Sequence, residues 1–177
     1  MKKDKDFNFR FVGSFNQVES LVDDVRSIDP ETWNYFKGRQ QTIVGHRYTK
    51  TIPLIFDWQK KTRLITHKLY DSFKIHLDSI SSFLQEAHED YEIVRANLVL
   101  LSAGKSIDRH MDKGDFLLSS RRIHIPVLTN TACIFIIDDE QKHLSVGEVW
   151  EVNNTGKFHS VHNEGGTDRV HLIIDVK

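Results

Sequence analysis

The second half of this chain is a succession of short, β-rich segments separated by turn residues. Glycines and polar clusters such as TNT and DDEQK interrupt runs of branched and aromatic residues throughout residues 91–177. This spacing predicts short antiparallel strands, and a count of eight is typical of a two-sheet jelly roll. The predicted strands cover residues 91–102, 106–112, 121–128, 132–138, 142–146, 148–153, 158–163 and 168–176.

The first half predicts helices as well as strands. Phe7, Phe9 and Phe11 alternate as in a half-buried strand, and a helical pattern follows over residues 14–28. The stretch QTIVGHRYTKTIPLIF predicts one or two further strands, and apolar residues at helical spacing then predict a long amphipathic helix over residues 62–89. We therefore expect an α+β fold, with a double-stranded β-helix (jelly-roll, cupin-like) core of about eight strands and N-terminal helices packed on one sheet.

We expect one domain over residues 1–177, formed by a helical and strand-containing N-terminal part (1–90) and the jelly-roll core (91–177). A length of 177 residues suffices for one hydrophobic core. The formal net charge of −1 gives no electrostatic basis for binding nucleic acid or a membrane surface. The single cysteine, Cys133, cannot form an internal disulfide, and no signal peptide or membrane-spanning run is visible, so we expect a cytoplasmic protein.

The segment IDRHMD contains a pair of potential metal ligands. His110 and Asp112 lie two positions apart, so they point to the same face of an extended strand. The seventh predicted strand lies beside the second in a jelly roll, and it carries His159 and His162 on opposite faces. Strand phase alone does not choose between these two histidines. Two imidazoles and one carboxylate form the facial triad of non-haem Fe(II) oxygenases, although Zn(II), Mn(II) or Ni(II) also accept such ligands.

An inward-facing arginine would complete the site of a 2-oxoglutarate-dependent oxygenase. The co-substrate chelates iron through its 1-carboxylate and 2-keto oxygens, and its far carboxylate then needs a cation. Arg169 begins the apolar strand DRVHLIIDV, and the planar fork of an arginine grips a carboxylate with two hydrogen bonds. Alternatively, Arg169 is exposed at the end of the strand or pairs with Glu164 or Asp168.

The segment SRRIHIPV shows a similar pattern. Arg122 and His124 share one face of the predicted strand, while apolar side chains occupy the other face, so both would line the same interior as the metal. The alternatives are a rim arginine and a hydrogen-bonded core histidine. If the substrate is an amino acid or a peptide, its carboxylate also needs a cation, for which Arg122, Arg47 and His46 are candidates.

The motifs IDRHMD, RRIHIPVLTN and LSVGEVWEVNNTGKFHSVHNEGGTDRVHLIIDV, in this order, resemble the aspartyl/asparaginyl β-hydroxylase family. This family is a branch of the Fe(II)/2-oxoglutarate-dependent oxygenases that includes bacterial free-proline hydroxylases. The resemblance extends from about Ala96 to the C-terminus and is weaker over GHRYTKTIPLIF. It implies that the second iron-binding histidine is His159, which opens the motif HSVHN ten residues before Arg169, and that His162 is not a ligand.

The resemblance also implies an activity. Fe(II) would be held by His110, Asp112 and His159, and 2-oxoglutarate by Arg169, with Arg122 and His124 on a strand that helps to hold the co-substrate or the substrate. Such a dioxygenase uses O₂ to hydroxylate an unactivated C–H bond of an amino acid or a peptidyl residue (aspartate-, asparagine- or proline-like), and it releases succinate and CO₂.

One position bears on the substrate. The vertebrate-type aspartyl hydroxylases have a glycine where this chain has Asp112, whereas the free-proline hydroxylases keep the aspartate. The resemblance therefore favours a free amino acid or a short peptide. The jelly roll itself also suits two other classes of protein: a cupin-type metal-dependent isomerase or lyase, and a non-catalytic domain that binds a metal or a small molecule.

Overall fold

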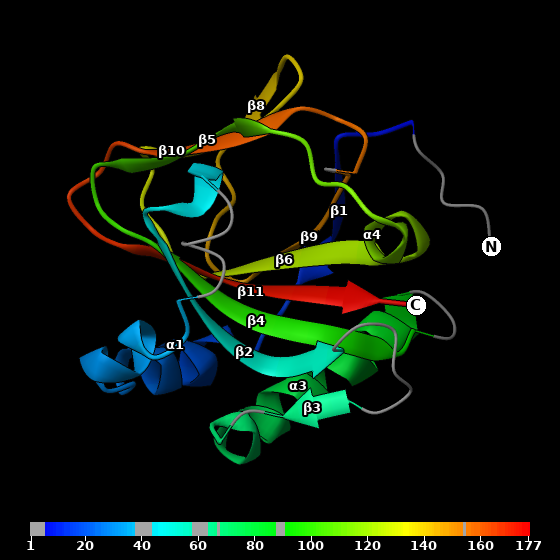
Figure 1. Cartoon of the computed structure of the whole chain (residues 1–177). Coiled ribbons are helices and arrows are strands. Elements are labelled where there is room, and N and C mark those ends of the chain that lie inside the picture. Colours follow the sequence, from blue (N-terminus) through cyan, green and yellow to red (C-terminus); the bar gives the residue numbers. More distant parts are fainter. Residues whose placement is uncertain (1–5, 38–43, 58–63, 67, 88–90, 154) are drawn as a thin grey trace.

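Two antiparallel β-sheets lie face to face in the computed structural model, which describes residues 6–37, 44–57, 64–66, 68–87, 91–153 and 155–177. Helices cover the outer face of the larger sheet (Figure 1). The strands are β1 (Phe9–Ser14), β2 (Thr49–Asp57), β3 (Leu64–Thr66), β4 (Ile93–Leu101), β5 (Lys105–His110), β6 (Arg121–Leu128), β7 (Cys133–Ile137), β8 (Glu140–Lys142), β9 (Glu148–Val152), β10 (His159–Asn163) and β11 (Arg169–Val176). The helices are α1 (Val18–Arg26), α3 (Tyr70–Ala87) and α4 (Asp115–Ser119), with 3₁₀ turns η1 (Pro30–Asn34) and η2 (Val44–His46).

The predicted jelly roll is confirmed, and its eight core strands divide equally between the sheets. In the described part of the chain, the large sheet has the strand order β1-β9-β6-β11-β4-β2-β3, and the small sheet has the order β5-β10-β7-β8. Strands β4 to β11 therefore supply four strands to each sheet. The N-terminal strands widen the large sheet at its two edges, because β1 pairs with β9 and β2 pairs with β4.

One predicted core strand is displaced. The sequence predicts a strand over residues 142–146, but β8 covers residues 140–142 and pairs with the end of β7. The connecting turn is tighter than expected, since only Asp138 and Asp139 form it, and Asp138 adopts a left-handed conformation with φ of 49°. Aspartate tolerates this conformation better than most residues, which permits so short a turn. Leu144 lies beyond the strand and is buried in the core.

The predicted helix over residues 62–89 was placed too early. Residues 64–66 instead form β3, in which the β-branched Ile65 and Thr66 pair with β2, and α3 begins only at Tyr70. Residues 62–63 and 88–90 lie outside the described residues. The short helix α4 was not predicted, because five residues are too few to show a helical period.

The strands of the large sheet present different chemistry on their two faces. On β6 and β11, alternate side chains pack into the core cluster to which α1 and α3 also contribute. This set consists of Ile123, Ile125, Val127, Val170, Leu172, Ile174 and Val176. The intervening side chains face the small sheet, and they include Arg122, His124, Arg169 and His171. The alternation that predicted this arrangement is therefore confirmed.

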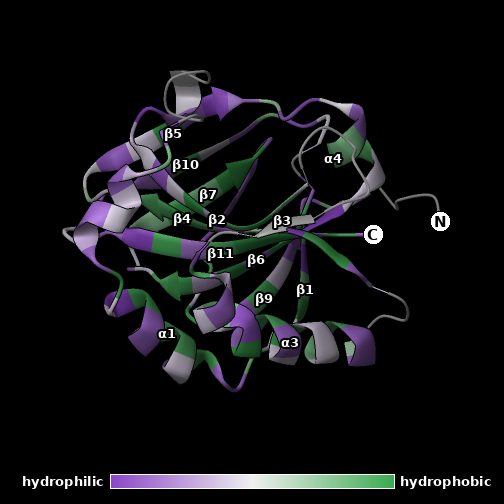
Figure 2. Ribbon diagram, turned by 60° about the horizontal axis from the view of Figure 1, so that its bottom comes forward, coloured by the Kyte–Doolittle hydropathy of each residue, from purple (hydrophilic) through white to green (hydrophobic). Residues whose placement is uncertain are grey.

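No helix in the described ranges combines the length and the apolar character needed to cross a membrane. The longest of them, α3, is instead amphipathic and lies along the large sheet (Figure 2).

Two isoleucines on α3 provide a matched test of how this helix is seated. Ile80 is fully buried, whereas Ile75 is 68% exposed. We expect Ile80→Ala to lower the free energy of unfolding by about 2–5 kcal/mol, because it leaves a cavity in the core. Ile75→Ala should change it by less than about 0.5 kcal/mol. Urea unfolding followed by circular dichroism measures both values, and equal losses would contradict the described packing of α3.

Candidate metal centre

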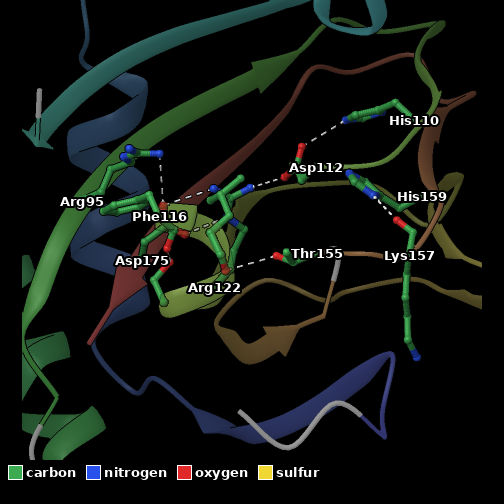
Figure 3. A network of polar contacts seen from close by, with 11 residues as sticks. Arg95, His110, Asp112, Phe116, Arg122, Thr155, Lys157, His159 and Asp175 are labelled. Atoms are coloured by element: carbon green, nitrogen blue, oxygen red, sulfur yellow. Dashed lines mark hydrogen bonds and ion pairs between the residues drawn. The ribbon is translucent and has the colours of Figure 1, made fainter. Parts of the chain in front are cut away.

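Three potential metal ligands meet at one end of the space between the sheets. His110 ends β5 and His159 begins β10, and the two residues lie opposite each other in the antiparallel register. Asp112 follows β5 and forms an isolated bridge with Thr155. One ligand atom from each of His110, Asp112 and His159 lies within 4.8 Å of the other two, as Figure 3 shows from close by. The described residues thus bring together two imidazoles and one carboxylate, a set that divalent iron accepts.

The two histidines of HSVHN are separated by β10. His159 is 5% exposed and lines the cavity between the sheets with His110 and Asp112. His162 lies on the opposite face, where its ring nitrogens are 3.2 Å from the Ser106 hydroxyl and 3.3 Å from the Ser160 hydroxyl. The fold therefore places His159, and not His162, beside the other two candidate ligands.

Main-chain carbonyls orient both imidazoles of the triad. Nδ1 of His110 lies 2.7 Å from the Asp108 carbonyl oxygen, and Nδ1 of His159 lies 3.3 Å from the Lys157 carbonyl oxygen. A carbonyl only accepts, so Nδ1 carries the hydrogen in each ring and Nε2 keeps the lone pair. This is the arrangement by which proteins select Nε2 as the metal-binding atom. These contacts could not be predicted from the sequence, since each depends on local backbone geometry.

The protonation states of the triad suit a metal ion. Burial acts to raise the pKa of Asp112, but contact with His110 and the nearby charge of Arg122 outweigh it and hold this pKa well below its usual range. Burial lowers the pKa of His159 to about 4, although the negative charge of Asp112 opposes this shift. At neutral pH the site therefore offers an ionised carboxylate and a neutral imidazole, as metal binding requires.

Arg122 contacts two carboxylates of the protein. Its Nη1 donates to Oδ2 of Asp112 at 2.6 Å, and its Nε and Nη2 donate to the carboxylate of Asp175 at 2.8 and 3.1 Å (Figure 3). Burial alone would lower the pKa of Arg122, but these two anions raise it above its ordinary value. Sequence reasoning missed Asp175, although an acidic residue within the apolar run LIIDV, on the same face as Arg169, was a visible indication.

Arg169 is the second buried cation of this interior. Its side chain is 1% exposed and lines the cavity together with the triad. Its Nη2 donates to Nδ1 of His171 at 2.6 Å, whereas its Nε has no hydrogen-bond partner among the described residues. The same part of the chain places no carboxylate within 4.0 Å of this guanidinium. Burial lowers the pKa of Arg169 to about 10, so it is charged at neutral pH and suits an anionic ligand.

The arginine also determines the tautomers of two neighbouring histidines. Because Arg169 only donates, Nδ1 of His171 accepts and carries no hydrogen. His171 Nδ1 also lies 3.3 Å from Nδ1 of His124, and a hydrogen bond between these two atoms requires His124 to be the donor, because the His171 atom carries no hydrogen. In that tautomer, His124 has a lone pair on Nε2, which has no hydrogen-bond partner among the described residues. Burial and the charge of Arg169 lower the pKa of both histidines, which keeps them neutral.

The two remaining candidates lie in different surroundings. His46 is 5% exposed and lines the cavity, with its ring centroid 5.1 Å from that of His110. Arg47 pairs with Asp108 at 2.7 Å on the surface, where both side chains are about half exposed. The structure therefore brings His46, but not Arg47, to the cavity that contains the triad.

Comparison with known proteins gives a family match. A family model described as aspartyl/asparaginyl beta-hydroxylase matches residues 22–177. No curated protein matches the sequence.

Three solved structures share the fold at low sequence identity. An oxidoreductase of the 2OG-Fe(II) oxygenase family from Burkholderia pseudomallei has a TM-score of 0.57 at 12% identity and covers 92% of each chain. A Pseudomonas putida prolyl-4-hydroxylase has a TM-score of 0.54 at 12% identity, over 97% of this chain and 93% of that one. A viral collagen prolyl hydroxylase from Paramecium Bursaria Chlorella virus-1, solved with 2OG, has a TM-score of 0.56 at 7% identity, over 97% and 96%.

The two histidines of β10 give the most direct test of the metal centre. We expect His159→Ala to weaken the binding of Co(II), used as a spectroscopic substitute for Fe(II), by at least about tenfold, because one of three protein ligands is lost. His162→Ala, on the other face of the same strand, should change it less than twofold. Titration of the metal-free protein followed by visible absorption measures both. Equal effects would exclude His159 as the third ligand.

Proposed function

The chain belongs to the aspartyl/asparaginyl β-hydroxylase family, and on this basis we propose that it hydroxylates an unactivated C–H bond of an amino acid or a peptidyl aspartate-, asparagine- or proline-like residue. The co-substrates are 2-oxoglutarate and O₂, and the products are the hydroxylated substrate, succinate and CO₂. One observation carries the proposal: a buried, charged Arg169 that meets no carboxylate in the described residues lies in the same cavity as the His110–Asp112–His159 set.

The residues present fit Fe(II) and 2-oxoglutarate. His110, Asp112 and His159 would hold the metal on one triangular face, which leaves positions for a chelating keto acid and for O₂. When bound, the iron and its keto-acid partner supply the activation of O₂ that lets one oxygen atom enter the C–H bond. The protein contributes ligands of fixed geometry and a cavity with apolar walls, formed by Val99, Ile107, Phe135, Val161 and Ile173.

Arg169 would bind the far carboxylate of 2-oxoglutarate. A guanidinium in this position forms two parallel charge-assisted hydrogen bonds with a carboxylate, and the low polarity around it strengthens them. Arg122 and His124 were also predicted to hold the co-substrate. Arg122 already contacts two carboxylates, and His124 presents a lone pair, which suits an N–H or O–H group better than either carboxylate of 2-oxoglutarate.

We therefore propose that the substrate binds beside His46 and His124. Both are buried polar residues of the cavity. The presence of Asp112, as in the free-proline hydroxylases, supports a free amino acid or a short peptide. Prolyl hydroxylases are also among the structures that share this fold, so proline and prolyl peptides come first in a substrate screen.

We further propose that residues 1–177 act as one oxygenase domain. Strands from the N-terminal part extend the same large sheet as the jelly-roll strands, and both parts contribute to one core cluster. A cupin-type isomerase or lyase would have no use for Arg169 as a keto-acid anchor, and the family match supports the hydroxylase instead.

The proposal is tested by two linked assays. Under anaerobic conditions, Fe(II) and 2-oxoglutarate added to the metal-free protein should produce the weak visible charge-transfer band of a chelated keto acid. Free amino acids and short peptides are then screened under air for a mass increase of one oxygen atom, with an equal yield of succinate. If no band forms at any 2-oxoglutarate concentration, the metal serves another chemistry and the proposed function is wrong.

Replacement of Arg169 tests whether this residue binds the co-substrate or only stabilises the fold. We expect Arg169→Met to weaken 2-oxoglutarate binding at saturating metal by at least about 30-fold, since a buried charge pair is lost. The thermal stability of the ligand-free protein should not fall, because the variant removes a buried charge that has no carboxylate partner in the described residues.

Arg109→Met serves as the control for this replacement, because Arg109 is exposed and stacks on Phe158. It should leave 2-oxoglutarate binding unchanged. A lower thermal stability of Arg169→Met together with unaltered 2-oxoglutarate affinity would assign Arg169 to the structure alone.

A further inference from the structure

We propose that Arg122, fixed by Asp175, is a positioning residue for the metal-binding carboxylate of Asp112 and does not bind the co-substrate. The inference rests on the proposed function in one respect, since it takes Asp112 as a metal ligand. It assigns a role to Asp175 and changes the role that the sequence suggested for Arg122. The contacts that support it join three separate segments: the residues after β5, strand β6 and strand β11 (Figure 3).

Asp112 needs support from outside its own strand. Strand β5 ends at His110, so Asp112 is not held by the regular ladder that fixes the two histidines in register. Its backbone makes one isolated bridge, to Thr155. A carboxylate on such a segment would rotate among several side-chain conformers unless a partner held it.

Arg122 is this partner, and it contacts only one of the two oxygens of the Asp112 carboxylate. Its Nη1 donates to Oδ2 of Asp112 at 2.6 Å, while the other oxygen, Oδ1, lies 3.6 Å from Nε2 of His110. The two carboxylate oxygens are thus distinguished: Oδ2 is held by the arginine, and Oδ1 lies beside a metal-binding nitrogen. This orientation presents Oδ1 to the metal.

Asp175 keeps Arg122 in place. The two residues face each other in the β6–β11 register, and the carboxylate accepts from both Nε and Nη2 of the guanidinium. Asp175 is 1% exposed, so this bidentate pair is shielded from water. Three of the five N–H groups of Arg122 therefore donate to carboxylates of the protein. Only one N–H on each of Nη1 and Nη2 is left for another acceptor, and the guanidinium is already oriented by Asp112 and Asp175.

Charge and geometry predict opposite effects when Arg122 is replaced. By charge alone, removal of a cation beside a metal site would strengthen the binding of a divalent metal. By geometry, loss of the contact that orients Asp112 would weaken it. The double variant Arg122→Met/Asp175→Asn removes one charge of each sign, so the change in metal affinity reports mainly the geometry.

The experiment is a Co(II) titration of the metal-free full-length protein, followed by the visible absorption of the bound ion. We expect the double variant to bind Co(II) about 10- to 100-fold more weakly, with a changed absorption spectrum. The dissociation constant of 2-oxoglutarate, measured at saturating Co(II), should stay within threefold of the unmodified protein. The single variant Arg122→Lys keeps the charge but loses the fork, and should show a smaller loss of Co(II) affinity.

A matched control lies on the opposite face of β6. Arg121 and Glu151 form a similarly placed ion pair, with Nε and Oε1 3.4 Å apart, outside the cavity. Arg121→Met/Glu151→Gln should leave Co(II) binding within twofold. If the double variant at Arg122 and Asp175 does not fold, Arg122→Lys carries the test.

Two outcomes overturn the inference. In the first, Co(II) affinity and spectrum are unchanged in the folded Arg122 variants. In the second, these variants lose at least tenfold in 2-oxoglutarate affinity while Co(II) affinity stays the same, which would make Arg122 a co-substrate contact. Asp112→Ala is measured in parallel. Unaltered Co(II) binding in that variant shows instead that the proposed metal centre is wrong, and so identifies which of the two proposals has failed.

Discussion

The balance of buried charge between the two sheets is the constraint on which the rest of this structure depends. Asp112 and Asp175 contribute two negative charges to the inner face, and Arg122 and Arg169 contribute two buried positive ones. Arg95, which is partly exposed, adds a further positive charge 3.6 Å from Asp175. Arg122 neutralises its neighbours directly, whereas Arg169 lies apart from any described carboxylate. A divalent metal and a dianionic keto acid would add no net charge to this interior, and each would bind beside the opposite charge, which limits the free energy of desolvation.

Much of the fold could be predicted from the sequence, because a strand with one apolar face shows its alternation directly. Arg122 and Arg169 stood out because each interrupts a strand whose alternate residues are apolar. Boundaries were predicted less well. Leu64 and Ile65 of β3 are apolar, and Ile65 continues the helical period, but pairing with β2 makes this segment a strand. Pairing between two separate segments is not visible in a local pattern.

The site could be predicted only in part, for a related reason. His110 and Asp112 are neighbours in the sequence, so local spacing was enough to find them. The choice between His159 and His162 needed either a family resemblance or the observed register of β10 against β5. Of the groups that orient the site, Arg122 was found from the sequence, but Asp175 and the orienting carbonyls were missed. Asp175 lies 53 positions from Arg122, and the carbonyls that orient the imidazoles belong to the backbone, where residue type gives no indication.

The three candidate ligands are held in position by two different kinds of contact. His110 and His159 are fixed by a ladder of main-chain hydrogen bonds, and their ring tautomers are fixed by backbone carbonyls. Asp112 is fixed by a side-chain network, Arg122 with Asp175, that reaches across to the other sheet. The positions of the two histidines are thus determined by the small sheet, and the orientation of the Asp112 carboxylate is determined by contacts with the large sheet. The geometry of the proposed metal site therefore requires the two sheets to be correctly packed against each other.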